Sequence, residues 1–82
     1  MIEPDAIVAK IQAAIPDAIV EAHDLTGTRD HYEVIVISQA FEGLTRIKRH
    51  RLVYEALHEE MKAAIHALTL QVYTPTQWEQ AQ

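Results

Sequence analysis

Residues 31–38 constrain the fold most, because β-branched and aromatic side chains dominate this run and favour a strand. Before it, residues 18–25 show the two-residue alternation of a half-buried strand. Residues 26–30, Thr-Gly-Thr-Arg-Asp, have the composition of a turn. The sequence therefore predicts a β-hairpin whose loop places His31 at the mouth of the second strand.

A helix is predicted ahead of this hairpin. Pro4 stands near the first helical position with a carboxylate on either side of it, and both features suit a helix start. Isoleucine then recurs at helical spacing. Because Pro16 disfavours helical geometry at the residue before it, we expect this helix to end near Ala14.

A second, longer helix is predicted in the middle of the chain. Counting forward from His50, an apolar stripe at helical spacing includes Val53, Tyr54 and Leu57 and continues through Ile65. We therefore expect His50 to lean toward the buried side. A kink or separate first turn near Lys48 is compatible with the sequence.

A third strand and a last helix complete the chain. Alternation over residues 67–73 predicts the strand. Thr74, Pro75 and Gln77 then have the spacing of a capping box with proline at the first helical position, which predicts the start of a short helix carrying Trp78.

The order of these elements predicts one α+β domain over residues 1–82, with an α-β-β-α-β-α sequence of elements. A helical connection between the second and third strands implies that these two strands pair in parallel, with a right-handed crossover. We therefore expect a three-stranded mixed sheet with helices on one face.

Composition excludes several classes of site. The chain has no cysteine, so a metal held here must bind histidine nitrogen or carboxylate oxygen. No apolar run approaches the ~20 residues of a membrane span, and the acidic N-terminus is unlike a secretory signal, so we expect a cytoplasmic protein without a membrane partner. No paired carboxylates, nucleophile–base arrangement or phosphate loop stands out, so we expect no enzyme.

Positive charge is concentrated in one segment. Four of the seven Lys and Arg residues fall within six positions of a chain whose formal net charge is −5. They are Arg46, Lys48, Arg49 and Arg51. We expect these side chains to point to water, with His50 among them.

Four short motifs resemble those of the BolA family, and they occur in the right order and spacing. They are His31-Tyr32-Glu33-Val34-Ile35-Val36, Phe41-Glu42-Gly43, Arg49-His50-Arg51-Leu52-Val53-Tyr54 and Thr74-Pro75-Thr76-Gln77-Trp78. The resemblance covers nearly the whole chain. It implies a fold similar to the class II KH domain, which agrees with the order of elements reached from periodicity.

The resemblance also implies a function in iron–sulfur trafficking or in iron and redox regulation. BolA-like proteins form a heterodimer with a monothiol glutaredoxin, bridged by a [2Fe–2S] cluster. Carried onto this chain, the family's ligands are His50 and His31, with glutaredoxin and its glutathione supplying the sulfur ligands. His23 is a substitute for His31, and the four cations are expected to attract the acidic or glutathione-bearing partner.

Other interpretations of these histidines and of the function stay open. From spacing alone, His50 is a half-buried histidine at the edge of the core, His31 a loop residue and His23 an exposed strand residue; His58 is interpreted as surface, and His66 carries no functional signal. The alternative function is a KH-like transcriptional regulator that binds nucleic acid, with weak DNA binding as the corresponding partner call, although Gly43 lacks the second glycine of a GxxG clamp. The oligomeric state, monomer or homodimer, is also open.

Overall fold

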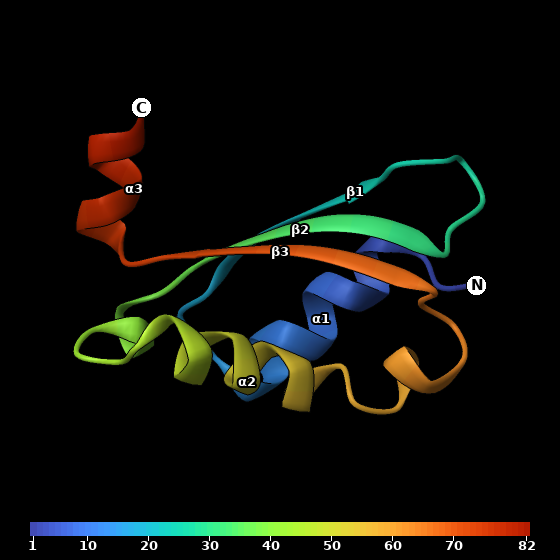
Figure 1. The fold of residues 1–82 in the computed structure, drawn as a ribbon, viewed down its shortest axis with the longest axis horizontal. Helices are drawn as coiled ribbons and strands as arrows, with labels where there is room; N and C mark the ends of the chain where they lie inside the picture. The colour runs from blue at the N-terminus through green and yellow to red at the C-terminus, as the bar shows by residue number, and fades with distance from the viewer.

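A computed structural model describes residues 1–82 as three strands, three α-helices and two short 3₁₀ turns (Figure 1). The elements are α1 (Pro4–Ala14), β1 (Ile19–Asp24), β2 (His31–Ile37), η1 (Gln39–Phe41), α2 (Arg46–Ala56), η2 (Glu60–Lys62), β3 (Ala67–Tyr73) and α3 (Pro75–Ala81). The predicted α-β-β-α-β-α order is confirmed. None of the three helices is long and apolar enough to cross a bilayer.

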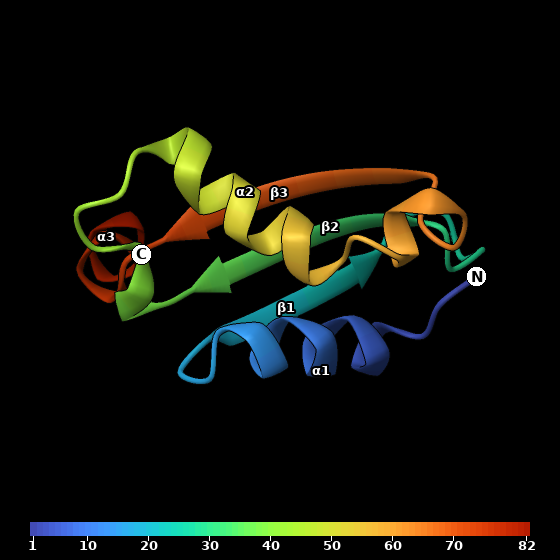
Figure 2. The same cartoon turned by 90° about the horizontal axis from the view of Figure 1, so that it is seen from below.

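The sheet is mixed, with strand order β1-β2-β3. β1 pairs antiparallel with β2, which confirms the hairpin. β3 pairs parallel with β2, and the register places Ala67 opposite His31. α1 and α2 lie on one face of the sheet (Figure 2), while α3 follows β3 at the far end and rises on the other side (Figure 1). The prediction that the helices cover one face therefore holds for α1 and α2 but not for α3.

The core fills the layer between the sheet and the two covering helices. Alternate residues of β2, namely Tyr32, Val34 and Val36, are fully buried there, as a strand of period two requires. Ile7 and Ile11 of α1 meet them from the helical layer. Burying each such side chain stabilises the fold by roughly 1.5–3 kcal/mol.

The helix boundaries predicted from proline and capping residues are confirmed. α1 ends at Ala14, and the N–H of Ile15 donates to the carbonyl of Ile11 at 2.8 Å. At the start of α3, the hydroxyl of Thr74 accepts from the N–H of Gln77 at 3.2 Å, and the Gln77 amide oxygen accepts from the N–H of Thr74 at 3.1 Å. The capping box is therefore formed in both directions.

The predicted continuation of the central helix through Ile65 is wrong. α2 begins at Arg46, with the Thr45 hydroxyl accepting from the N–H of Lys48 at 3.3 Å, and it has no separate first turn at Lys48. The helix ends at Ala56, and the chain continues through the single turn η2.

Sheet dimensions explain why this helix stops early. Twenty helical residues would span roughly 30 Å, whereas a seven-residue strand spans only about 23 Å. The crossover must return the chain to the end of the sheet where β3 begins. Ile65 is still buried, so the apolar pattern correctly identified a core residue but assigned it to the wrong element.

Asp17 ties the loop before β1 to the end of β2. Its carboxylate accepts from the Ser38 hydroxyl at 2.5 Å and from the N–H of Gln39 at 2.9 Å. These two bonds, the hydroxyl first, hold the pKa of Asp17 below its ordinary value of 3.8. The ionised carboxylate therefore stabilises the folded state.

We expect Asp17→Asn to lower the urea midpoint of unfolding at pH 7, because one amide oxygen cannot replace both carboxylate oxygens. A depressed pKa in the folded state means that the stabilisation is complete above the unfolded value and is lost as pH falls through the folded one. The difference between wild type and variant should therefore shrink below pH 3.8. Equal midpoints at pH 7, measured by circular dichroism, would contradict this expectation.

Candidate functional site

Two histidines meet at the end of the sheet where β2 and β3 begin. The ring centroids of His31 and His66 lie 5.9 Å apart, with the rings tilted by 51°. The backbone fixes this approach, because the N–H groups of His66 and Ala67 both donate to the carbonyl of Asp30, at 2.7 and 3.2 Å. Two imidazoles are thus presented side by side at one end of the molecule.

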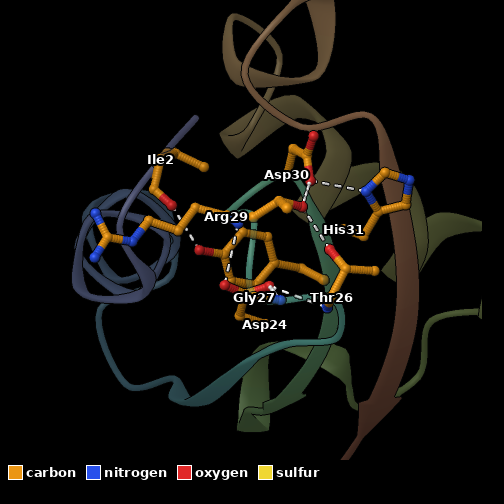
Figure 3. A network of polar contacts seen from close by, with 9 residues as sticks. Ile2, Asp24, Thr26, Gly27, Arg29, Asp30 and His31 are labelled. Carbon is orange, nitrogen blue, oxygen red and sulfur yellow. Dashed lines mark hydrogen bonds and ion pairs between the residues drawn. The ribbon is translucent and has the colours of Figure 1, made fainter.

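The loop before His31 is held by side-chain bonds rather than by regular structure (Figure 3). The Asp24 carboxylate accepts from the N–H groups of Thr26 at 3.2 Å, Gly27 at 2.9 Å and Arg29 at 3.1 Å. Gly27 and Arg29 both have positive φ, at 77° and 59°. The Asp24 bonds stabilise a left-handed backbone that Arg29 would otherwise disfavour.

The N-terminal segment fastens the same loop from outside (Figure 3). The N–H of Ile2 donates to the carbonyl of Arg29 at 3.0 Å, and the Arg29 guanidinium pairs with the Glu3 carboxylate at 2.5 Å. The buried ring of Tyr32 adds its hydroxyl, which donates to the carbonyl of Ile2 at 2.5 Å. The position of His31 is therefore defined from both sides of the loop.

Asp30 orients the first of the two imidazoles. Its Oδ1 lies 2.8 Å from Nδ1 of His31 and also accepts from the Thr28 hydroxyl. The Thr28 bond, then the His31 bond, then the charges of His31 and His66 lower the pKa of Asp30. In the neutral form of His31, hydrogen bonding to ionised Asp30 makes Nδ1 the donor and leaves the lone pair on Nε2.

His50 lies elsewhere. Its Nδ1 is 2.9 Å from the carbonyl of Arg46, within α2, and its ring is 6.5 Å from that of Tyr54. It borders a cavity of about 230 Å³ beside β3, whose other lining residues include Leu70 and Tyr73. The expected lean toward the sheet is seen, but Tyr54 of the same predicted stripe is exposed.

The structure does not bring His50 and His31 together. Tyr73 is opposite Ile37, six residues along β2 from His31, so the cavity beside His50 is roughly 10–20 Å from the start of β2. Metal–imidazole bonds of about 2 Å, the length known for zinc, cannot span that separation. The two histidines assigned from the resemblance therefore do not form one site.

His23 is engaged within its own strand. Its Nε2 lies 3.2 Å from the carboxylate of Glu21, and the register places it opposite Glu33. The molecule holds no group of three His, Cys, Asp or Glu side chains close enough to enclose a metal ion.

The four cations divide into two kinds. Arg46, Lys48 and Arg51 are exposed, as expected. Arg49 was also expected to point to water, and this is wrong. Its Nε donates to the carbonyl of Leu44 at 3.0 Å and its Nη1 to the amide oxygen of Gln77 at 2.7 Å. Arg49 thus joins the start of α2 to the first turn of α3.

We expect Arg49→Ala to lower the free energy of unfolding by about 1–2 kcal/mol, because it breaks both of these bonds. Arg49→Lys should recover only part of the loss, since an ammonium group lacks the planar fork. Arg51→Ala, an exposed control two positions away, should change stability by less than about 0.5 kcal/mol. Urea unfolding that gives equal midpoints for Arg49→Ala and Arg51→Ala would contradict this assignment.

His66 is the site residue that sequence reasoning missed. The predicted parallel pairing could have identified it, because two parallel strands that begin at residues 31 and 67 place their first residues at the same end of the sheet. The residue immediately before the third strand is therefore a neighbour of His31. That inference needed the register, which the sequence pattern left undefined.

The protein is a small α+β domain, a three-stranded mixed sheet covered by two helices. It carries a pair of imidazoles, suited to bind a metal, at one end of the sheet. A family model described as BolA-like protein matches residues 11–77. The chain belongs to the BolA-like family.

Individual relatives agree with this assignment. BolA-like protein 1 of Mus musculus is 40% identical over 80 residues, covering 89% of this chain and 58% of that protein. The chain thus spans about three fifths of the length of such mammalian relatives. The DNA-binding transcriptional regulator BolA of Escherichia coli is 33% identical, with 92% and 78% covered. A solved BolA homologue from Coxiella burnetii has a TM-score of 0.81 at 38% identity, with 96% and 99% covered.

Proposed function

We propose that this chain is a cytoplasmic, non-enzymatic adaptor that shares a [2Fe–2S] cluster with a monothiol glutaredoxin, in iron–sulfur trafficking or iron and redox regulation. His31 and His66 are the ligands in this proposal. The observation that carries it is the approach of their rings to 5.9 Å at one end of the sheet.

The chemistry of this donor pair fits half of such a cluster. Imidazole replaces thiolate on one iron of Rieske centres, so two histidines form an accepted ligand set for a [2Fe–2S] cluster. The hydrogen bond between Asp30 and Nδ1 of His31 is the carboxylate–histidine pairing that commonly supports metal-binding imidazoles. Bound there, a cluster would supply one-electron redox chemistry or a source of iron and sulfide.

The chain lacks the remaining ligands. It has no cysteine, and no third metal-binding side chain joins the two histidines. A partner must therefore provide sulfur, which a glutaredoxin thiolate and glutathione would do. The apo protein alone should bind little iron for the same reason.

The assignment of His50 as a ligand stays an untested prediction. In our proposal it is replaced by His66, because His50 lies beside β3 and apart from His31. For the same reason the cations at the start of α2 are unsuited to contacting glutathione at the cluster. In their predicted role toward glutaredoxin, they would steer its approach through long-range attraction.

The test is reconstitution of the complex. Purified protein, a monothiol glutaredoxin, ferrous iron, sulfide and glutathione are mixed anaerobically, and the visible absorption and circular dichroism spectra are compared with those of glutaredoxin alone. We expect a heterodimer on size exclusion with a spectrum distinct from that of the glutaredoxin homodimer. An unchanged spectrum and no heterodimer would refute the proposal.

DNA binding is the second candidate function. Arg46, Lys48 and Arg51 form an exposed cationic cluster, and the Escherichia coli relative is named a DNA-binding regulator. The chain as a whole is acidic, with a net charge of −5, so we expect affinity for DNA to be weak at physiological salt. Fluorescence anisotropy with labelled duplex and single-stranded DNA at that salt concentration would decide between the two.

A further inference from the structure

The outer side of α2 exposes apolar side chains in the middle of the cationic cluster. Ile47 is 71% exposed and Tyr54 is 39% exposed, although each is large enough to belong in a core. They lie seven residues apart, with His50 and Arg51 between them, so all four fall on one stripe of the helix. We call Ile47, His50, Arg51 and Tyr54 the α2 outer face; His50 stands at its edge, because it also borders the cavity beside β3. With Arg46 they line a shallow cavity of about 430 Å³.

The charge around this face is opposite to that of the rest of the chain. Residues 46–51 hold four of the seven cations and no carboxylate; Arg49 among them is bonded to Leu44 and Gln77, and the first carboxylate along the helix is Glu55, four positions after Arg51. The remaining residues hold three cations against twelve carboxylates. An apolar centre with a cationic margin therefore occurs on a chain that is otherwise negatively charged.

The α2 outer face is also separate from the histidine pair. α2 starts at the end of the molecule where β2 and β3 finish, whereas His31 and His66 lie where those strands begin (Figure 1). The long axis of the molecule extends 33 Å. A partner seated on the histidines would leave this face open.

We infer that the α2 outer face docks an acidic amphipathic helix of a second partner protein. Such a helix presents apolar side chains at positions i, i+3 or i+4 and i+7, which match the spacing of Ile47, His50 and Tyr54, and its flanking carboxylates face Arg46 and Arg51. Protein–protein interfaces typically have aromatic and aliphatic side chains at their centre and a polar or charged rim, as this face does. The protein would thereby connect a cluster-bearing partner at one end to a client at the other.

A nucleic acid fits the face less well. The phosphates of a nucleic acid would pair with the cations, and Tyr54 could stack on a base. Ile47, however, would have no apolar surface to pack against on a sugar–phosphate backbone. Gly43 is followed by Leu44-Thr45-Arg46, so the glycine pair that clamps a nucleic acid backbone in KH domains is absent. The exposed isoleucine therefore favours a protein helix.

A phage library of random 12-residue peptides, panned against the wild-type protein, tests this inference. The strongest binders would be synthesised and their affinities measured by fluorescence polarisation against three proteins. These are wild type, the double variant Ile47→Ser/Arg51→Glu, and the matched control Ile19→Ser/Lys62→Glu, which likewise replaces an isoleucine by serine and a cation by glutamate at exposed positions elsewhere. All substituted residues are exposed, and circular dichroism would verify that each variant folds.

We expect enriched peptides with two or more carboxylates around apolar residues at helical spacing. Their affinity for the α2 variant should be lower than for wild type by roughly tenfold or more, which corresponds to about 1.4 kcal/mol for the loss of one interface anchor side chain. Their affinity for the control variant should equal that for wild type. Because Arg51 is one of the cations expected to steer glutaredoxin, heterodimer formation is tested with the single variant Ile47→Ser, which should still form the glutaredoxin heterodimer. The peptide should bind the wild-type heterodimer as well as it binds the free protein.

Four outcomes would overturn the inference. They are failure to enrich acidic amphipathic peptides, equal binding to both variants, tighter binding of a 12-nucleotide oligothymidine than of any peptide at physiological salt, and loss of the glutaredoxin heterodimer in Ile47→Ser. The last would assign this face to glutaredoxin. Absence of a heterodimer even with wild type would refute the proposed function and leave this peptide test standing.

Discussion

A His66→Ala variant should form no stable bridged cluster with a monothiol glutaredoxin, whereas a His50→Ala variant should form one as readily as wild type. His66 is one of the two imidazoles that meet at the start of β2 and β3. Changes to groups that merely support a ligand already lower metal affinity roughly 10–100-fold, so losing a ligand should lower it by at least that much. The measurements are the visible spectrum and the rate of cluster loss to a chelator.

Two further variants make this comparison decisive. His31→Ala should lose the cluster as His66→Ala does. His31→Cys should retain it with a lower reduction potential, because thiolate donates more charge to iron than imidazole. Circular dichroism of each apo protein serves as the fold control. A cluster that survives His66→Ala but is lost in His50→Ala would restore the assignment drawn from the family motif.

The order of elements could be predicted because the local rules were consistent with one another. Pro16 ended the first helix near Ala14, and the Thr74 and Gln77 capping box started the last one, as the structure confirms. The β-branched run of β2 identified the central strand. In each case the determining interaction lies within a few residues along the chain.

The errors occurred where the determining contact was distant in sequence. Arg49 was assigned to water because its neighbours are cationic, but its partner Gln77 lies 28 positions away. α2 ends early because the chain must reach the position where β3 begins. The spacing of apolar residues along the sequence carries no information on that position. The same spacing correctly marked Ile65 as buried.

The assignment of His50 and His31 as ligands stays untested, but the motif could not show that the structure places these two residues apart. A motif places His50 among residues resembling those of a family, but it carries no information on what the imidazole faces in space. The pairing of His31 with His66 depends on the parallel register and on the Asp30 carbonyl that receives two N–H bonds from the incoming strand. Whether two ligands lie close together depends on the tertiary structure. Predicting that His31 and His66 meet requires at least the register between β2 and β3.

Ile65→Ala should destabilise the fold by roughly 2–5 kcal/mol, against about 0.5–1.5 kcal/mol for Ile65→Val. Ile65 is only 2% exposed and packs in the main core cluster. A domain of this size is expected near the lower end of the usual 5–15 kcal/mol of stability, so the alanine variant should lose a large share of it. Ile47→Ala, at an isoleucine that is 71% exposed, is the matched control and should change the midpoint little.

This substitution should also affect the histidine pair, because Ile65 anchors the segment that delivers His66. No regular helix holds residues 63–66; the N–H of Ile65 bonds to the carbonyl of Glu60 at 2.9 Å, and the next N–H bonds to Asp30 at 2.7 Å. Loosening Ile65 frees His66 while leaving His31 fastened by its own loop. We therefore expect Ile65→Ala, studied at low temperature where it remains folded, to lose a glutaredoxin-bridged cluster to a chelator faster than Ile65→Val. Equal urea midpoints and equal loss rates for these two variants would show that the segment is held by its backbone bonds alone.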